Sequence, residues 1–511
     1  MRTLSLLQEV AGPPDPGYLE QDRTTLSDLG IGQIVDSVTR GREEWDLGPL
    51  FRTRATRTST VEYRQAVFRD LENGKTLAAV SAFAASLRRA RELVGNMENR
   101  RHVPQQGAWF LQAVQLYCRA LLDLAAALAN LELGSSGLRS WREFLSEHVV
   151  APGFTSLHAE AASVRDQLDR VRYQVDVIGG RVTVRRHQGE ADYGAEIRAM
   201  FARFQQAEGQ SHLFQMPLRH ELSSVEERIL DLVVRLFPEP FSAQQSFWER
   251  HRDFWDPTVR RVERELQFYL AYLEHIEPLR QAGLAFSYPA IGTDSKVERA
   301  RGTFDLAMAA RLVPAGVPVV GNDFELAGAE RLLVVSGPNQ GGKTTLARTF
   351  GQLHHLAALG CPVPGTELAL LLCDQLLTHF EREERLEDLR GRLEDDLVRV
   401  EEILTRATGR SVVILNETFG SASLEDGREL GQAVVEQLMG RGVLGVYVTF
   451  IVELSALGPA TVSMVSQVDP DDPARRTFRV ERRPADGLAY ALAVAQRHGM
   501  TYAQLQRALH C

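Results

Sequence analysis

The hydrophobic pattern divides the chain into helical stretches and a C-terminal region of a different kind. Apolar residues recur every three or four positions from about Val61 to Leu133 and again from about Ser224 to Gly283. The first repeat includes Leu77, Val80, Phe83, Leu87 and Leu93. This spacing predicts long amphipathic helices. Beyond Tyr288-Pro289, short apolar runs alternate with helical ones. Buried-type strands separated by helices predict a parallel α/β sheet.

A short segment between the helical stretches, Val171–Arg186, has the two-residue period of β-strands. Valines alternate with polar residues on both sides of Gly179-Gly180. Two alternating runs around Gly-Gly predict a β-hairpin, which would form a small tip on a helical stalk.

The hairpin segment is strongly basic. Between residues 170 and 187 a single acid, Asp176, accompanies five arginines, namely Arg170, Arg172, Arg181, Arg185 and Arg186. Because arginine pairs with phosphate whatever the base sequence, we predict a structure-selective DNA contact through Arg172, Arg181, Arg185 and Arg186. A solvated hairpin in an arginine-rich chain is the alternative.

The length of 511 residues predicts two to four domains. We expect an N-terminal segment at 1–40, a helical core or lever domain at 41–290 with its tip near 170–187, and an α/β domain at 291–511. The predicted fold class is therefore α + α/β.

Composition narrows the classes of function. The net charge is −9, with 44% hydrophobic and 24% charged residues. These values are typical of a globular protein and exclude a basic nucleic-acid coat, so any DNA contact has to be local. The four scattered cysteines lack metal-ligand spacing and favour a reducing, cytoplasmic setting. Apolar runs such as Leu121–Leu131 are shorter than the roughly 20 residues of a membrane span, so no membrane partner is expected.

The clearest chemical signal is the glycine-rich run Gly337-Pro338-Asn339-Gln340-Gly341-Gly342-Lys343-Thr344, which fits G-x-x-x-x-G-K-[ST]. It follows the apolar run Leu332–Val335 and precedes a helical pattern, as a P-loop requires. Glycines let backbone N–H groups converge on phosphate oxygens at the positive end of a helix. Lys343 is expected to reach the β- and γ-phosphates of ATP, and Thr344 to ligate Mg²⁺. A chance glycine-rich turn is the alternative.

A second element follows at Val412–Leu415, a buried-type strand that ends in Asn416 and Glu417. In P-loop enzymes the strand beside the loop ends in an acid on the Mg²⁺ side, and a following glutamate polarises the attacking water. Glu417 fits the catalytic role, whereas Asn416 stands at the metal position and is neutral. An ordinary strand end is the alternative.

Together these runs resemble the MutS family of mismatch-repair ATPases. Gly337 through Thr345 is similar to the family's G-P-N-x-G-G-K-[ST]-[ST] loop. Further likenesses lie at Gly321-Asn322-Asp323, Gly360–Pro364, Asn416–Gly427, Thr449–Leu454 and Gly487–Ala495. The resemblance covers residues 300–511 strongly and 40–290 more loosely.

The resemblance implies a slow ATPase that uses ATP and Mg²⁺, with an ABC-like P-loop domain at 291–511. It also implies a C-terminal helical dimerisation segment and a homodimer with composite ATP sites. A helical lever would couple ATP binding to a DNA clamp in mismatch repair or damage sensing.

Three positions depart from the family pattern. The family's metal-side acid is Asn416 here, which should weaken Mg²⁺ binding because hard cations prefer carboxylate oxygen. The family's histidine is Phe450, and its Ser-Thr pair aligns near Gly391-Arg392, where Arg392 is a candidate contact to the partner's phosphate. The first 100 residues also lack an F-x-E triplet, so mismatch reading by the family's route is not expected.

We therefore predict a dimeric, ATP-dependent clamp or sensor of DNA structure. Two alternatives stay open. The first is a nucleotide-gated scaffold with little or no ATPase activity, and the second is a clamp that acts on structured RNA or ribosomes.

Overall fold

The computed structural model describes residues 4–9, 18–98, 102–179, 181–189, 223–381, 391–469, 476–485 and 506. The chain divides into two compact units. The sheet unit comprises residues 1–77, 132–140 and 258–511, and the helical unit comprises residues 78–131 and 141–257. This division differs from the expected linear order, because much of the chain before residue 78 groups with the C-terminal region.

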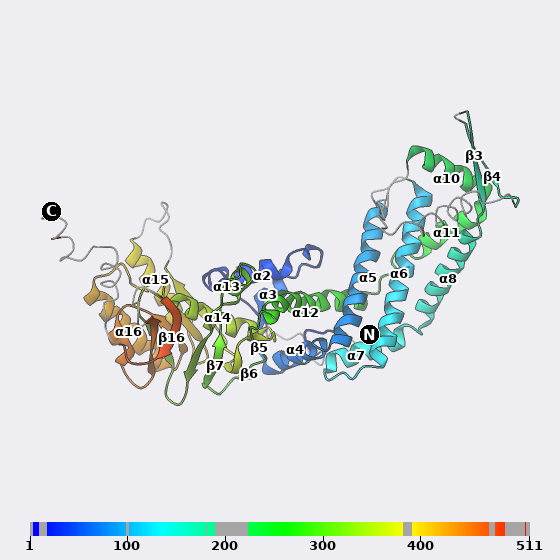
Figure 1. Ribbon diagram of the computed structural model, residues 1–511. Helices are drawn as coiled ribbons and strands as arrows, with labels where there is room; N and C mark the ends of the chain where they lie inside the picture. Colours follow the sequence, from blue (N-terminus) through cyan, green and yellow to red (C-terminus); the bar gives the residue numbers. More distant parts are fainter. Residues whose placement is uncertain are drawn as a thin grey trace, which may run out of the picture. The chain divides into compact units, whose positions relative to one another are not determined.

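The helical unit contains α6 (Val103–Ala129), α8 (Pro152–Asp169), α10 (Ser224–Leu236), α11 (Pro238–Arg250) and most of α5 (Gly74–Glu98) and α7 (Ser136–His148) (Figure 1). Their apolar faces meet in an aromatic core. The ring of Phe110 lies 5.9 Å from that of Phe247 and 5.5 Å from that of Phe254. By length and composition α6 could cross a membrane, yet half of its apolar window is buried inside the structure.

The predicted hairpin is present in the helical unit. Strands β3 (Tyr173–Ile178) and β4 (Arg181–Arg186) are antiparallel, with Val175 opposite Val184. Gly179 has a φ of +55°, in the left-handed region that tight hairpin turns require. β4 packs beside α10 (Figure 1).

The centre of the sheet unit is a six-stranded sheet with the order β12-β13-β14-β9-β15-β16. Its strands are β9 (Leu332–Ser336), β12 (Leu376–Phe380), β13 (Val412–Asn416), β14 (Leu444–Val448), β15 (Thr461–Val468) and β16 (Arg476–Arg482). The first five are parallel, as predicted, and β16 pairs antiparallel with β15 at the edge. The chain therefore has the mixed helical and sheet composition that the sequence indicates.

Helices cover both faces of this sheet. On one face α15 (Arg392–Arg406) and α16 (Leu424–Arg441) bury Val400, Val434 and Leu438 against strand residues that include Val413. On the other face α14 (Lys343–Ala358) packs so closely that a Cβ on Gly351 would lie 2.8 Å from Ile414.

The remaining elements of the sheet unit surround this core. A four-stranded sheet has the order β6-β11-β7-β8, and β5 pairs with β10. These strands are β5 (Phe286–Ser287), β6 (Ala290–Gly292), β7 (Glu298–Thr303), β8 (Asn322–Leu326), β10 (Val363–Pro364) and β11 (Thr366–Leu371). The other elements are β1 (Tyr18–Glu20), α1 (Arg23–Asp28), α2 (Ile31–Thr39), η1 (Glu43–Trp45), α3 (Gly48–Arg52), β2 (Thr53–Ala55), α4 (Thr58–Leu71), α12 (Pro257–Gln281), α13 (Leu306–Leu312) and η2 (Val452–Ala456).

The N-terminal elements are bonded directly to α14. Arg348 Nε donates to Asp28 O at 3.0 Å, and Gln352 Nε2 donates to Leu29 O at 2.8 Å. One turn further on, His355 Nε2 lies 2.8 Å from Phe51 O. These polar contacts are buried or partly buried. α14 therefore packs against the sheet on one side and is hydrogen-bonded to residues 28–51 on the other.

Candidate nucleotide-binding site

The glycine-rich loop connects β9 to α14, where the sequence predicts it. Its backbone takes left-handed conformations at Gly337 (φ +120°), Gln340 (φ +58°) and Gly342 (φ +95°). Ser466 of β15 closes the loop from behind, because its hydroxyl donates to Gly341 O at 2.6 Å. A Cβ on Gly341 would lie 2.2 Å from Ser466 Oγ, so a larger residue there would displace this bond.

Lys343 begins α14 and is 4% exposed. Its ammonium donates to Gly337 O at 2.8 Å, to Pro338 O at 3.1 Å and to Asn339 Oδ1 at 3.4 Å. Burial lowers the pKa of Lys343, and the carboxylate of Glu417 partly offsets that effect. The cation is thus held by neutral oxygens of the loop, and anionic phosphate oxygens would solvate it better.

Thr344 and Asn416 meet beside this lysine. The Thr344 hydroxyl donates to Asn416 Oδ1 at 2.9 Å, and Asn416 is buried at the end of β13. The two oxygens that sequence reasoning assigned to Mg²⁺ therefore lie together. Both are neutral, so they fit Mg²⁺ through a hydroxyl ligand and through a bound water rather than through a carboxylate.

Glu417 directly follows β13. Its φ is +54°, and its backbone N–H donates to Val448 O at 2.9 Å, which fixes the strand end. A non-glycine residue in this region is strained, and such residues gather at functional sites. Glu417 and the glycine-rich loop line the same pocket. The arrangement brings the predicted water-activating carboxylate to the predicted phosphate end.

The pocket has a volume of about 360 Å³, and its lining is of two chemical kinds. The polar part, which we call the polar end, comprises Asn339–Thr345 and Glu417. The apolar part, which we call the apolar end, comprises Phe304, Met308, Leu312, Val317, Pro318, Val319, Val320 and Phe478. A triphosphate fits the chemistry of the first end and a nucleobase that of the second.

Sequence reasoning missed the apolar end and the residues that fasten the loop from behind. The apolar run Val317–Val320, directly before Gly321-Asn322-Asp323, was the one local signal available for this end. Ser466 lies in β15 and Phe478 in β16, and the sheet order alone places these strands beside the loop. No local pattern marks them.

Phe450 and Arg392 occupy the other positions at which this chain departs from the family pattern. The Lys343 ammonium lies 4.6 Å from the centre of the Phe450 ring, which replaces a hydrogen-bonding imidazole with a cation–π contact. Arg392 pairs with Glu381 of the same chain. The stretch Gly487–Ala495, which carried another part of the resemblance, lies outside the described residues.

The four arginines predicted to contact DNA are not equivalent. Arg172 donates to Val171 O at 3.1 Å, and Arg185 pairs with Asp176 at 2.9 Å. Arg186 donates to Leu236 O at 2.7 Å and lies over the Phe237 ring. Among the described residues, Arg181 at the turn has no side-chain partner. The predicted basic hairpin is formed, but Arg185 also pairs across its two strands and Arg186 fastens it to the end of α10.

Comparison with known proteins finds a matching family for part of the sheet unit. The family described as MutS domain V matches residues 333–508. Endonuclease MutS2 of Thermus thermophilus is 29% identical over 281 residues, which cover 53% of this chain and 38% of that protein. Endonuclease MutS2 of Gemmatimonas aurantiaca is 29% identical over 295 residues, 53% of this chain and 35% of that protein. DNA mismatch repair protein MutS of Oleidesulfovibrio alaskensis is 31% identical over 193 residues, 37% of this chain and 21% of that protein.

The chain therefore spans well under half the length of each of these relatives.

Proposed function

We propose that this chain, a MutS-family protein whose residues 333–508 match domain V, is an ATP-dependent DNA-binding protein. The observation that carries the proposal is the buried Lys343 ammonium, enclosed by the glycine-rich loop at the start of α14. A lysine in this position is desolvated without an anionic partner in direct contact. A bound triphosphate would supply that partner.

The residues around the pocket divide the work of holding ATP. Backbone N–H groups of Asn339–Thr345 and the N-terminus of α14 would bind the phosphates. Thr344 and Asn416 would hold Mg²⁺, which neutralises phosphate charge when it is bound. The apolar end beyond Gly342 would take the base.

Glu417 would support hydrolysis of ATP by orienting a water molecule toward the γ-phosphate. Because Asn416 lacks the negative charge of an aspartate, metal binding is weakened and turnover is slow. The alternative of a nucleotide-gated scaffold has support in the same residue and in Phe450, which cannot donate or accept a hydrogen bond.

Measuring the rate of ATP hydrolysis with Mg²⁺ distinguishes a slow ATPase from a nucleotide-gated scaffold. An active wild type that loses its activity in Glu417→Ala supports the slow ATPase. Activity that appears only in Asn416→Asp supports the scaffold.

Binding of ATP itself is tested with lysine variants. Lys343→Ala should abolish binding of a fluorescent ATP analogue, because no other lysine lines the pocket. Lys75→Ala is the matched control, since Lys75 is an exposed lysine in the same unit. Equal affinity of both variants for the analogue would refute nucleotide binding at this loop.

The hairpin is the proposed DNA contact of the helical unit. Its arginines give it positive charge without base-reading groups, so binding should weaken with salt and depend little on sequence. Competition between branched DNA, duplex DNA and structured RNA distinguishes a DNA clamp from the alternative that acts on RNA or ribosomes.

A homodimer with composite ATP sites is also part of the proposal and rests on the family resemblance. Measuring the molar mass by light scattering with and without ATP tests it, and a monomer under both conditions would contradict it.

A further inference from the structure

The turn that begins at Glu417 is strained on both sides of Thr418. Glu417 has a φ of +54° and Phe419 a φ of +64°, left-handed values that residues with side chains rarely adopt. Strain of this kind persists only where the surrounding structure imposes it. Backbone bonds fix the two ends, because Glu417 N donates to Val448 O at 2.9 Å and Ala422 N donates to Phe419 O at 3.0 Å. The middle residue, Thr418, is buried and is held through its side chain.

His379 of β12 is the residue that holds Thr418. Its ring is buried, and its Nδ1 lies 3.3 Å from the Thr418 hydroxyl oxygen. Its other ring nitrogen, Nε2, lies 3.0 Å from Asp396 Oδ1 on α15. An ionised carboxylate can only accept a hydrogen bond, so it favours the tautomer in which Nε2 carries the proton. In that tautomer Nδ1 accepts a hydrogen bond from the hydroxyl of Thr418.

The three residues Asp396, His379 and Thr418 are 8%, 1% and 5% exposed. Tyr447 of β14 is fully buried near them. Burial raises the pKa of Tyr447, and the charge of Asp396 raises it further. Because water has little access to this cluster, solvent cannot replace a hydrogen bond that is lost there.

α15 contacts β12 and the Glu417 turn at further points. Arg399 Nη1 donates to Phe380 O, directly after His379 in the strand, at 3.3 Å. Val400 and Ile403 of α15 belong to the same apolar core as Phe419. The position of α15 is therefore coupled to that of the turn by both polar and apolar contacts.

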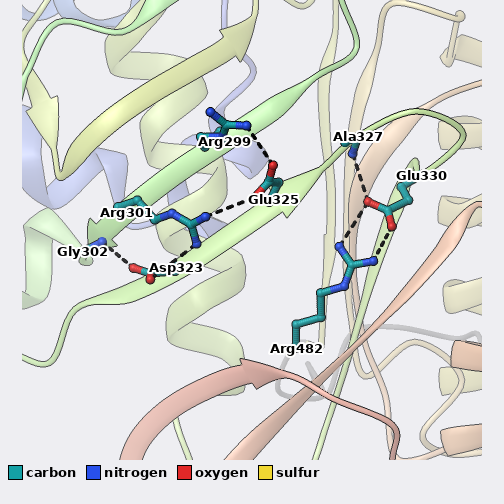
Figure 2. A network of polar contacts seen from close by, with 8 residues as sticks. All are labelled: Arg299, Arg301, Gly302, Asp323, Glu325, Ala327, Glu330 and Arg482. Carbon is teal, nitrogen blue, oxygen red and sulfur yellow. Dashed lines mark hydrogen bonds and ion pairs between the residues drawn. The ribbon is translucent and has the colours of Figure 1, made fainter.

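The charged network around β7 and β8 has a different character (Figure 2). Glu325 pairs with Arg299 at 3.0 Å and with Arg301 at 3.1 Å, and these side chains are between 29% and 48% exposed. Exposed ion pairs of this kind contribute little to stability. None of the residues drawn lines the nucleotide pocket, so this network provides a control for the buried one.

We propose that His379 is a positioning residue for ATP hydrolysis, which is held by Asp396 and fixes Thr418 and the neighbouring Glu417 carboxylate. A displacement of about 1 Å in a reacting site can cost about a hundredfold in rate. The inference rests on the proposed function, because it concerns the hydrolysis that Glu417 would support. It adds a means of regulation, since the rate of hydrolysis then depends on the position of α15.

Steady-state ATP hydrolysis by the full chain with Mg²⁺, together with calorimetric titration of ATP, tests the proposal. Thr418→Val keeps the shape of the side chain but removes its hydroxyl, so kcat should fall by about ten- to hundredfold while the affinity for ATP stays unchanged. Thr418→Ser should restore kcat, because it restores the donor. His379→Gln should lower kcat by the same factor, and combining it with Thr418→Val should lower kcat no further, because both changes break one contact.

Thr461→Val is the matched control. Thr461 is also buried, but its hydroxyl donates to Ser455 O and Gly458 O, both at 3.0 Å, at the start of β15. Glu325→Gln is a second control, because it removes the shared carboxylate of the exposed network. Both controls should leave kcat unchanged.

An unchanged kcat in Thr418→Val, or a loss that Thr418→Ser does not restore, would overturn the positioning role. An equal loss of kcat in Thr461→Val would also overturn it, because the effect would then be one of general stability. All variants are repeated in the Asn416→Asp background, where the added carboxylate should raise turnover. If neither the wild type nor Asn416→Asp hydrolyses the ATP that it binds, hydrolysis itself is overturned, and the inference with it.

Discussion

Gln352 connects the nucleotide pocket to the N-terminal elements, and its truncation to alanine should destabilise the sheet unit strongly. The side chain is 1% exposed. Its Oε1 accepts a bond from Leu306 N at 2.8 Å at the start of α13, and its Nε2 donates to Leu29 O at 2.8 Å and to Asp305 Oδ1 at 2.9 Å. One amide thus joins α14, the pocket wall and the α1–α2 junction.

The magnitude follows from the groups that lose a partner. Gln352→Ala leaves Leu306 N and Leu29 O without this partner in a buried site, whereas Asp305 Oδ1 keeps its bond to Met308 N. A buried polar group that loses its partner costs about 1–3 kcal/mol, so the loss of two should lower the free energy of unfolding by about 2–6 kcal/mol. Urea unfolding followed by circular dichroism measures this as a lower midpoint with an unchanged slope.

Two further variants separate the hydrogen bonds from packing. Gln352→Glu has nearly the same shape, but its carboxylate cannot donate to Leu29 O and repels Asp305, so it should also destabilise. Gln432→Ala is the control, because the Gln432 amide bonds only Glu436 on the surface of α16 in the contacts described, and surface changes stay within about 0.5 kcal/mol. A Gln352→Glu variant as stable as wild type would refute the network.

Three other outcomes can be measured. Burial lowers the pKa of His355 to about 3, whereas the charge of Glu298 overcomes burial and raises the pKa of His354 to about 10. The contribution of His355 to the free energy of unfolding is therefore lost as the pH falls from about 6.5 toward 3. The contribution of His354 is lost as the pH rises from about 6.5 toward 10. Melting temperatures between pH 4 and 10 should show the acid slope reduced in His355→Gln and the alkaline slope reduced in His354→Gln; unchanged slopes would contradict the assignment. Arg186→Ala should speed amide hydrogen exchange in β3 and β4, because Arg186 fastens the hairpin. Arg181→Glu should leave this exchange unchanged and weaken DNA binding at low salt. The opposite pattern would contradict these two roles. Hydrogen bonds from His251, Arg250 and Ser156 lower the pKa of Glu160 to about 2. Glu160→Gln should therefore be less stable than the wild type at pH 6, and this difference should disappear as the pH falls from about 4.5 toward 2. A difference that persists at pH 2 would show another cause.

The sequence predicted the parts of the fold that local patterns determine. The strand–loop–helix order at Leu332–Ala358, the hairpin around Gly179 and the strand ending in Asn416 all follow from periodicity and short motifs within one segment. The assignment of site residues on these segments stays a prediction, although the structure brings Thr344 and Asn416 within hydrogen-bonding distance.

The parts that remained unpredicted depend on pairings between distant segments. The position of Phe478 depends on the order of strands β9, β15 and β16 and on Asn322, which lies more than 150 residues earlier. The return of residues 132–140 to the sheet unit depends on Asp70, whose carboxylate accepts bonds from the backbone of Gly134 and Ser135 at 2.9 and 2.8 Å. Charge counting likewise cannot show that Arg186 is engaged by α10.

The contacts of α14 indicate how a nucleotide could affect distant parts of the sheet unit. α14 carries Lys343 at its first residue and Gln352 in its middle. Gln352 also accepts a hydrogen bond from the start of α13, which lines the apolar end of the pocket. A shift of α13 on nucleotide binding has to strain this amide or move Leu29 with it, because packed interiors do not deform continuously. Leu29 leads into α2, whose Ser37 lies 3.3 Å from His275 on α12. The route from Lys343 to α12 therefore passes through the N-terminal helices. On the proposed function, severing it at Gln352 should reduce the effect of ATP on DNA binding even where both ligands still bind; an unchanged effect would contradict this route.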